Sequence, residues 1–114
     1  MRVERTDKDN VACLVIMEKT LDASMAQDFK TYLHNLVHEG KRGLILDLSH
    51  VIFMDSSALG ALVSALKAMG NKGEITLCSV REPIANILAL TRLDRVFKVM
   101  NDQESACREL GVEP

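Results

Sequence analysis

Short apolar runs alternate along the chain with longer segments in which apolar residues recur every three or four positions. The runs are rich in Val, Ile and Leu and predict strands at residues 11–17, 44–48, 75–80 and 96–99. The periodic segments predict helices with apolar stripes at residues 25–37, 59–69 and 84–88, and a last helix at residues 102–110. Strands that alternate with helices favour an α/β domain with a mainly parallel sheet.

Turn and capping residues mark the ends of several of these elements. The polar residues 7–10 predict a turn that pairs residues 2–6 with the first apolar run as a hairpin. Asp22 or Ser24 can cap the start of the first helix, and Ser24 with Gln27 has the spacing of a capping box. No linker or repeat interrupts the pattern, so we expect one domain over residues 1–114.

Charge and aromatic content argue against nucleic-acid binding. The 14 Lys and Arg residues against 16 Asp and Glu residues give a formal net charge of −2, so no basic excess faces a phosphate backbone. One Tyr, three Phe and no Trp leave few rings for base stacking. The most apolar stretch, residues 58–66, is far shorter than the ~20 residues of a membrane span, so we expect no membrane insertion.

Cysteine and histidine positions favour neither disulfides nor a metal. Cys13, Cys78 and Cys107 are odd in number and form no CxxC pair, which is typical of a reduced, cytoplasmic protein. His34 and His38 are four residues apart, but two ligands do not make a zinc site. No phosphate-binding loop, dinucleotide fingerprint or nucleophile elbow is present, so we expect no cofactor.

Asp47 follows a predicted central strand, where open α/β sheets often place their chemistry. It could be a phospho-accepting aspartate, as in receiver domains. The first strands, however, do not end in the acidic pair of such domains. A carboxylate that accepts hydrogen bonds from loop amides is the favoured interpretation.

Three consecutive polar residues, Asp55, Ser56 and Ser57, stand where a loop leads into the second helix. Simple N-capping accounts for them, because Asp and Ser are preferred caps. A helix N-terminus also tolerates an added anion, so a phosphate on Ser56 or Ser57 could be carried without unfolding the domain. Such a phosphate adds about −1.5 to −2 charges. From these residues alone, capping is favoured over switching.

Four segments of the chain resemble STAS-domain proteins of the bacterial anti-sigma factor antagonist family. They follow in the family's order at residues 20–24, 43–49, 53–60 and 90–94, with Met-Asp-Ser-Ser-Ala-Leu-Gly as the switch motif. The resemblance covers nearly the whole chain. It implies a single STAS domain with a four- to five-stranded, mostly parallel mixed sheet packed with about four helices.

The resemblance also implies a binding module that is not an enzyme. In that family the unphosphorylated protein binds an anti-sigma factor, usually a histidine-kinase-like ATPase with serine kinase activity, and the sigma factor is freed. The kinase phosphorylates the serine after the aspartate, here Ser56 with Ser57 as runner-up, and a metal-dependent serine phosphatase reverses this. The implied partner-binding residues are Asp22, Ser24, Asp47, Met54, Asp55, Ser57, Ala58, Leu59 and Gly60.

Two residues depart from the family pattern. Ala58 replaces a glycine, so we expect a stronger helix and a partner held farther away. Arg92 replaces a glycine suited to a left-handed helix end, so we expect the third helix to end differently. Two other functions stay open: a STAS adaptor subunit of a lipid-transport or stress-sensing complex, and a small enzyme that uses Asp47 or Ser56.

Overall fold

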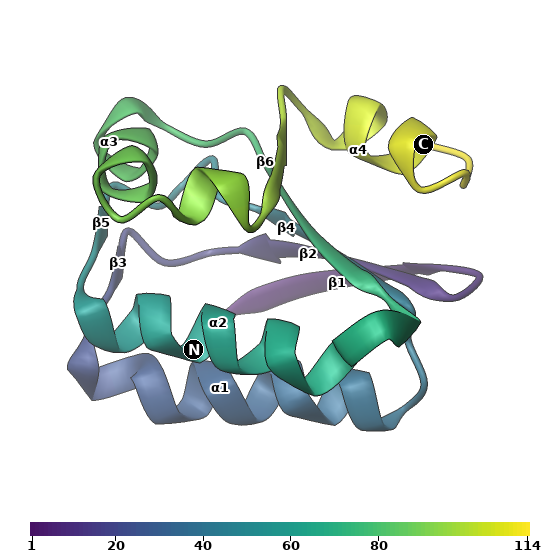
Figure 1. Cartoon of the computed structure of the whole chain (residues 1–114), viewed down its shortest axis with the longest axis horizontal. Helices are drawn as coiled ribbons and strands as arrows, with labels where there is room; N and C mark the ends of the chain where they lie inside the picture. The colour runs from purple at the N-terminus through teal and green to yellow at the C-terminus, as the bar shows by residue number, and fades with distance from the viewer.

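A five-stranded mixed sheet forms the centre of the computed structural model, which describes residues 1–114 (Figure 1). Its strands, in the order of the sheet, are β1 (Val3–Lys8), β2 (Val11–Ile16), β4 (Gly43–Asp47), β6 (Glu74–Cys78) and β7 (Lys98–Met100). The pair β1–β2 is antiparallel and the other pairs are parallel. The predicted hairpin and the mostly parallel mixed sheet are therefore confirmed.

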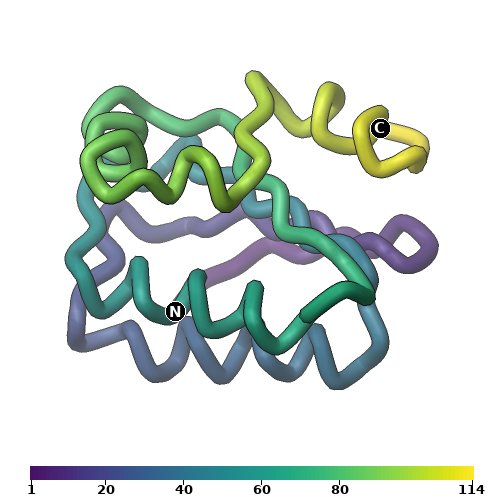
Figure 2. The backbone as a smooth tube through the Cα atoms, viewed as in Figure 1, coloured from purple at the N-terminus to yellow at the C-terminus, as the bar shows by residue number.

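Four helices surround this sheet: α1 (Ala23–His38), α2 (Ser56–Met69), α3 (Glu82–Leu90) and α4 (Gln103–Glu109). The backbone in Figure 2 shows α1 and α2 side by side along one face, with α4 on the other side of the sheet and α3 near one end. None of the helices is long and apolar enough to cross a membrane.

The strand β4 is buried on both faces, as its unbroken apolar sequence predicts. Leu44 and Leu46 belong to the large core cluster that also contains buried residues of α1 and α2. Ile45 belongs to a smaller cluster that includes Ala106 and Cys107 of α4. The alternation of side chains along the strand thus assigns even positions to the α1–α2 side and odd positions to the α4 side.

Several element ends differ from the sequence expectation. β6 stops at Cys78 because Ser79 has a positive φ of 54°, which an extended strand does not tolerate. β7 starts at Lys98, since residues 93–95 form a 3-10 helix and Phe97 turns into the core. The sequence also gave no signal for two short strands, β3 (Thr20–Leu21) and β5 (Phe53–Met54), which form a parallel pair.

The ends of two helices correct the sequence interpretation. Asp22 caps α1, so Ser24 is not the N-cap and the expected capping box is not formed; the Gln27 side chain donates to Thr31 Oγ1. Beyond α3, Arg92 adopts the left-handed conformation that a glycine would favour, with φ 62° and ψ 19°. The expected change at the end of this helix is therefore not seen, although the arginine occupies a strained backbone region.

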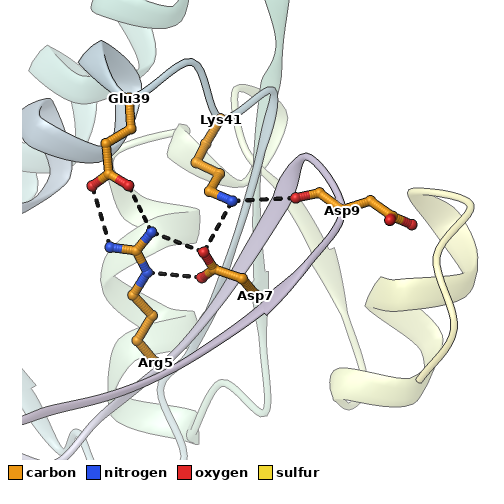
Figure 3. Close-up of polar contacts among 5 residues, drawn as sticks. All are labelled: Arg5, Asp7, Asp9, Glu39 and Lys41. Atoms are coloured by element: carbon orange, nitrogen blue, oxygen red, sulfur yellow. Dashed lines mark hydrogen bonds and ion pairs between the residues drawn. The ribbon is translucent and has the colours of Figure 1, made fainter.

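A network of charged side chains fastens the hairpin to the C-terminal end of α1 (Figure 3). The Arg5 guanidinium donates to both carboxylate oxygens of Asp7, at 2.7 and 3.0 Å, and to both of Glu39, at 3.2 and 2.8 Å. Lys41 Nζ lies 3.0 Å from Asp7 Oδ2 and donates to the carbonyl oxygen of Asp9. These hydrogen bonds hold the pKa of Asp7 at about 2.

Candidate functional site

The N-terminal ends of α1 and α2 meet at one end of the molecule, at the left of Figure 1. The short strands β3 and β5 pair there in parallel, with Leu21 beside Met54, and each leads into a helix after one capping residue. Asp22 caps α1 and Asp55 caps α2. The strand pairing therefore places two capped helix starts, and two carboxylates, next to each other.

Asp55 makes hydrogen bonds to both helix starts. Its Oδ1 accepts from the Ala58 amide at 3.1 Å, which is the usual N-cap bond within α2. Its Oδ2 accepts from the Ala23 amide of α1 at 2.8 Å, 32 positions away in the sequence. Its own backbone amide donates to the Leu21 carbonyl oxygen at 3.2 Å. One residue thus connects the turn before α1 to the start of α2.

Asp22 is held by bonds to its own turn. Its Oδ1 accepts from the Ser24 hydroxyl at 2.5 Å and from the Ser24 amide at 2.9 Å. These bonds, the hydroxyl first, lower the pKa of Asp22. Neither Asp22 nor Asp55 takes part in an ion pair, since all ion pairs of the chain lie in the hairpin region and at α4. This end of the molecule therefore carries two carboxylates without a cationic partner.

Ser56 and Ser57 are the first two residues of α2, and both are exposed. No hydrogen bond within the chain engages either hydroxyl, and neither backbone amide has an acceptor. Free amides at a helix start favour an anion placed beside them. The site can therefore accept a negatively charged group on either serine without breaking an existing side-chain contact.

Three of the expected partner-binding residues lie in the core instead of on the surface. Met54, Ala58 and Leu59 are all buried and belong to the large core cluster, and Ala58 has no exposed surface. The Ala58 methyl group therefore cannot keep a partner at a distance, which corrects the sequence expectation. Gly60, the residue after Leu59 in α2, is exposed.

Asp47 is separate from this site. It is 8% exposed and lies at the end of β4, where its Oδ1 accepts from the Ser49 amide at 2.8 Å. Its Oδ2 accepts from the Gln103 side chain of α4 at 2.9 Å. This arrangement agrees with the interpretation as a loop-binding carboxylate. Because it is buried and both of its oxygens accept hydrogen bonds, it offers little surface to a partner, and its role in partner binding stays a prediction.

Two exposed apolar residues border the site and had not been expected there. Ile52 is 43% exposed and Phe53 is 48% exposed, just before the buried Met54. Large apolar residues are usually assigned to the core from sequence, and β5 is too short to show an alternating pattern. Their amides both donate to the Lys19 carbonyl oxygen, which holds this apolar edge beside β3.

The histidines and cysteines do not form a second site. His34 Nε2 lies 2.9 Å from Ser64 Oγ and so joins α1 to α2, while His38 is exposed. No three His, Cys, Asp or Glu side chains come together as metal ligands do. All three cysteines are buried, with Cys13 Sγ and Cys107 Sγ 4.0 Å apart.

Comparison with known proteins gives the same fold over most of the chain. The family model of the STAS domain matches residues 2–106. The anti-sigma-B factor antagonist of Listeria monocytogenes is 28% identical, with 89% of this chain and 88% of the relative aligned. The anti-sigma F factor antagonist of Paenibacillus polymyxa is 31% identical over 60% of each chain. A crystal structure from Thermotoga maritima superposes with a TM-score of 0.83 at 29% identity, covering 94% of this chain and 92% of that one.

Proposed function

The chain belongs to the STAS domain family, and from this membership we propose that it is an anti-sigma factor antagonist. The unphosphorylated protein binds an anti-sigma factor in the cytoplasm and thereby frees a sigma factor. The anti-sigma factor is a serine kinase of the histidine-kinase-like ATPase type. It phosphorylates Ser56 and then releases the antagonist, which a metal-dependent serine phosphatase restores. The domain itself binds and does not catalyse.

The exposed Ser56 at the start of α2 is the observation that carries this proposal. A kinase can reach its hydroxyl, because the side chain is exposed and makes no hydrogen bond within the chain. The free amides of Ser56 and Ser57 are suited to a phosphate. Ser57 is also exposed and remains the second candidate, since Ser56 alone follows the capping aspartate as the family's phosphoacceptor does.

The charge at this end of the molecule explains how one phosphate can end binding. Asp22 and Asp55 together contribute about −2 here, and a phosphate adds about −1.5 to −2 more. The modification thus roughly doubles the local negative charge. A partner surface that fits two carboxylates meets strong added repulsion after phosphorylation, unless it carries several cations.

The exposed residues around Ser56 define the proposed binding surface. They are Ser24, Ile52, Phe53, Ser56, Ser57 and Gly60, and the half-buried Asp22 lies among them. Ile52 and Phe53 supply the apolar area that partner-binding surfaces need at their centre. The buried residues Met54, Ala58 and Leu59 support this surface from below, while Asp55 holds its two turns together.

The direct test uses an anti-sigma kinase of the histidine-kinase-like ATPase type from the organism that makes this protein. We expect incubation with the kinase and ATP to place one phosphate on Ser56, located by mass spectrometry of peptides. Calorimetric titration should give an affinity for Ser56→Ala close to that of the unmodified protein and a much weaker one for Ser56→Asp. Ser57→Ala and Ser57→Asp are the matched controls and should both bind.

Three outcomes would overturn the proposal. Equal affinities of Ser56→Ala and Ser56→Asp would remove Ser56 as the switch. Phosphate on Ser57 alone would transfer the switch to that residue. Recovery of membrane-transport subunits without any kinase, when the tagged protein is purified from its own cells, would instead favour an adaptor without a phosphorylation cycle.

A further inference from the structure

We propose that Asp55 is a positioning residue that transmits the charge state of Ser56 to the turn before α1. This inference rests on the proposed phosphorylation of Ser56 and adds a route by which it changes a second part of the surface. Asp55 is the residue directly before Ser56, and its carboxylate accepts a hydrogen bond from the Ala23 amide of α1. The switch then includes residues 22–24 as well as the start of α2.

The bond from Asp55 to α1 is additional to ordinary helix capping. Asp22 already caps α1 by accepting from the Ser24 amide at 2.9 Å. Asp55 already caps α2 through Oδ1. The second oxygen, Oδ2, therefore takes no part in capping α2. It accepts from the Ala23 amide of α1 at 2.8 Å. Both carboxylate oxygens are used, one for each helix.

A phosphate on Ser56 weakens the hydrogen bond between the Asp55 carboxylate and the Ala23 amide, here called the bridge, through electrostatic repulsion. The phosphate carries about −1.5 to −2 charges and is attached to the residue next to Asp55. The free Ser56 and Ser57 amides attract the phosphate to the start of α2, the region where the Asp55 carboxylate also lies. Repulsion between the two anions weakens both carboxylate bonds, because one rigid group makes them. The hydrogen bond of the Ala23 amide therefore weakens when Ser56 is phosphorylated, although no bond links Ala23 to Ser56.

The substitution Asp55→Asn should remove the bond to Ala23 while keeping the cap of α2. Asparagine is a good N-cap, so its single carbonyl oxygen can still accept from the Ala58 amide. Its other terminal group is an NH₂ donor, which cannot accept from the Ala23 amide. The matched control is Asp102→Asn in α4, where the aspartate accepts from the Ser105 amide at 2.8 Å but reaches no other helix.

Ala23→Pro breaks the same bond from the donor side. Ala23 is the first residue of α1, a position that proline favours because its missing N–H is not needed within the helix. The preceding residue, Asp22, has φ −123° and ψ −173°, which is compatible with a following proline. This variant keeps the inference testable if Asp55→Asn does not fold, as judged by circular dichroism.

The experiment compares amide spectra of the full chain with and without phosphoserine incorporated directly at position 56. In the unaltered sequence and in Asp102→Asn, we expect phosphoserine to shift the resonances of Ala23 and Ser24 together with those of Ser57 and Ala58. In Asp55→Asn the shifts at residues 57 and 58 should remain while those at residues 23 and 24 disappear. In Ala23→Pro the Ser24 shift should disappear in the same way. Unchanged Ala23 and Ser24 shifts in Asp55→Asn, or none in the unaltered sequence, would overturn the inference.

This measurement needs no partner, so failure of the proposed function and failure of the inference are distinguishable. Where the anti-sigma kinase binds, a second readout applies. The loss of affinity caused by Ser56→Asp should be smaller by about threefold or more in the Asp55→Asn background. Equal losses in the two backgrounds would show that Asp55 carries no part of the switch.

Discussion

Ala58→Gly should destabilise the domain without changing its affinity for the anti-sigma factor. The Ala58 side chain has no exposed surface and packs in the main core, so its methyl group contributes to folding and not to the binding surface. The substitution restores the residue type found in the family's motif. It therefore separates an effect on the core from an effect on partner approach.

The size of the effect follows from two contributions. Loss of one buried methyl group costs about 0.8 kcal/mol of hydrophobic free energy. Glycine in place of alanine costs up to about 1 kcal/mol in a helix interior, and roughly half of that in the first turn where fewer backbone bonds form. Together they predict a loss of about 1.3 kcal/mol. With an unfolding entropy of roughly 0.24 kcal/mol/K for a chain of this length, Tm falls by about 5 °C.

The matched control lies in the same helix. Gly60 is exposed, and a Cβ added there would have no heavy atom within 4 Å. Gly60→Ala should therefore raise the free energy of unfolding by about 0.5–1 kcal/mol through helix propensity alone. A lowered affinity of this variant would place the partner against the exposed side of α2.

Urea denaturation followed by circular dichroism measures the stability of both variants, and calorimetric titration measures their affinity for the anti-sigma factor. The expected pair of results is a lower urea midpoint for Ala58→Gly with an unchanged dissociation constant. An unchanged midpoint with a tenfold or larger change in affinity would refute the reasoning, because it would mean that the Ala58 methyl group contacts the partner.

Three further outcomes follow from other parts of the structure. The pKa of Asp7 is lowered from 3.8 to about 2, chiefly by Arg5, and that of Glu39 is lowered from 4.5 by Arg5, so this network contributes stability above about pH 4.5 and loses it as the pH falls to about 2. The difference in urea midpoint between the unaltered protein and Arg5→Gln should shrink over that range, and a difference independent of pH would contradict this. Arg92→Gly should stabilise the domain by about 1 kcal/mol in urea denaturation by removing a left-handed non-glycine residue, whereas Arg92→Ala should give no such gain. Burial raises the pKa of Cys13 to about 11 and that of Cys78 to about 12, so iodoacetamide should alkylate these thiols slowly in the native protein and rapidly in urea; complete native modification within minutes would argue against their burial.

Local sequence patterns were sufficient for most of the fold. The apolar run 44–48 predicted a strand buried on both faces, and β4 is such a strand. The three- and four-residue spacing of apolar residues predicted α1 and α2 along their core-facing sides. The capping candidates Asp22 and Asp55 each accept from an amide of their own turn, which is why a local sequence signal could identify them. The ends of β6 and β7 were misjudged because Ser79 and residues 93–95 depart from extended backbone for reasons that hydrophobicity does not report.

The sequence by itself determined the alternation of strands and helices, the family motif, and the position of Ser56 at a helix start, because each depends on contacts between residues close in the chain. Only the tertiary structure decided which motif residues are available to a partner. The pairing of β3 with β5 brings Ala23 to Asp55, 32 positions away, and creates the bridge between the two helices. The packing of α2 buries Ala58 and leaves Gly60 exposed, while the pleat of β4 directs Asp47 towards α4. Burial and long-range hydrogen bonds arise from the register and faces of packed elements, which no single segment of sequence specifies.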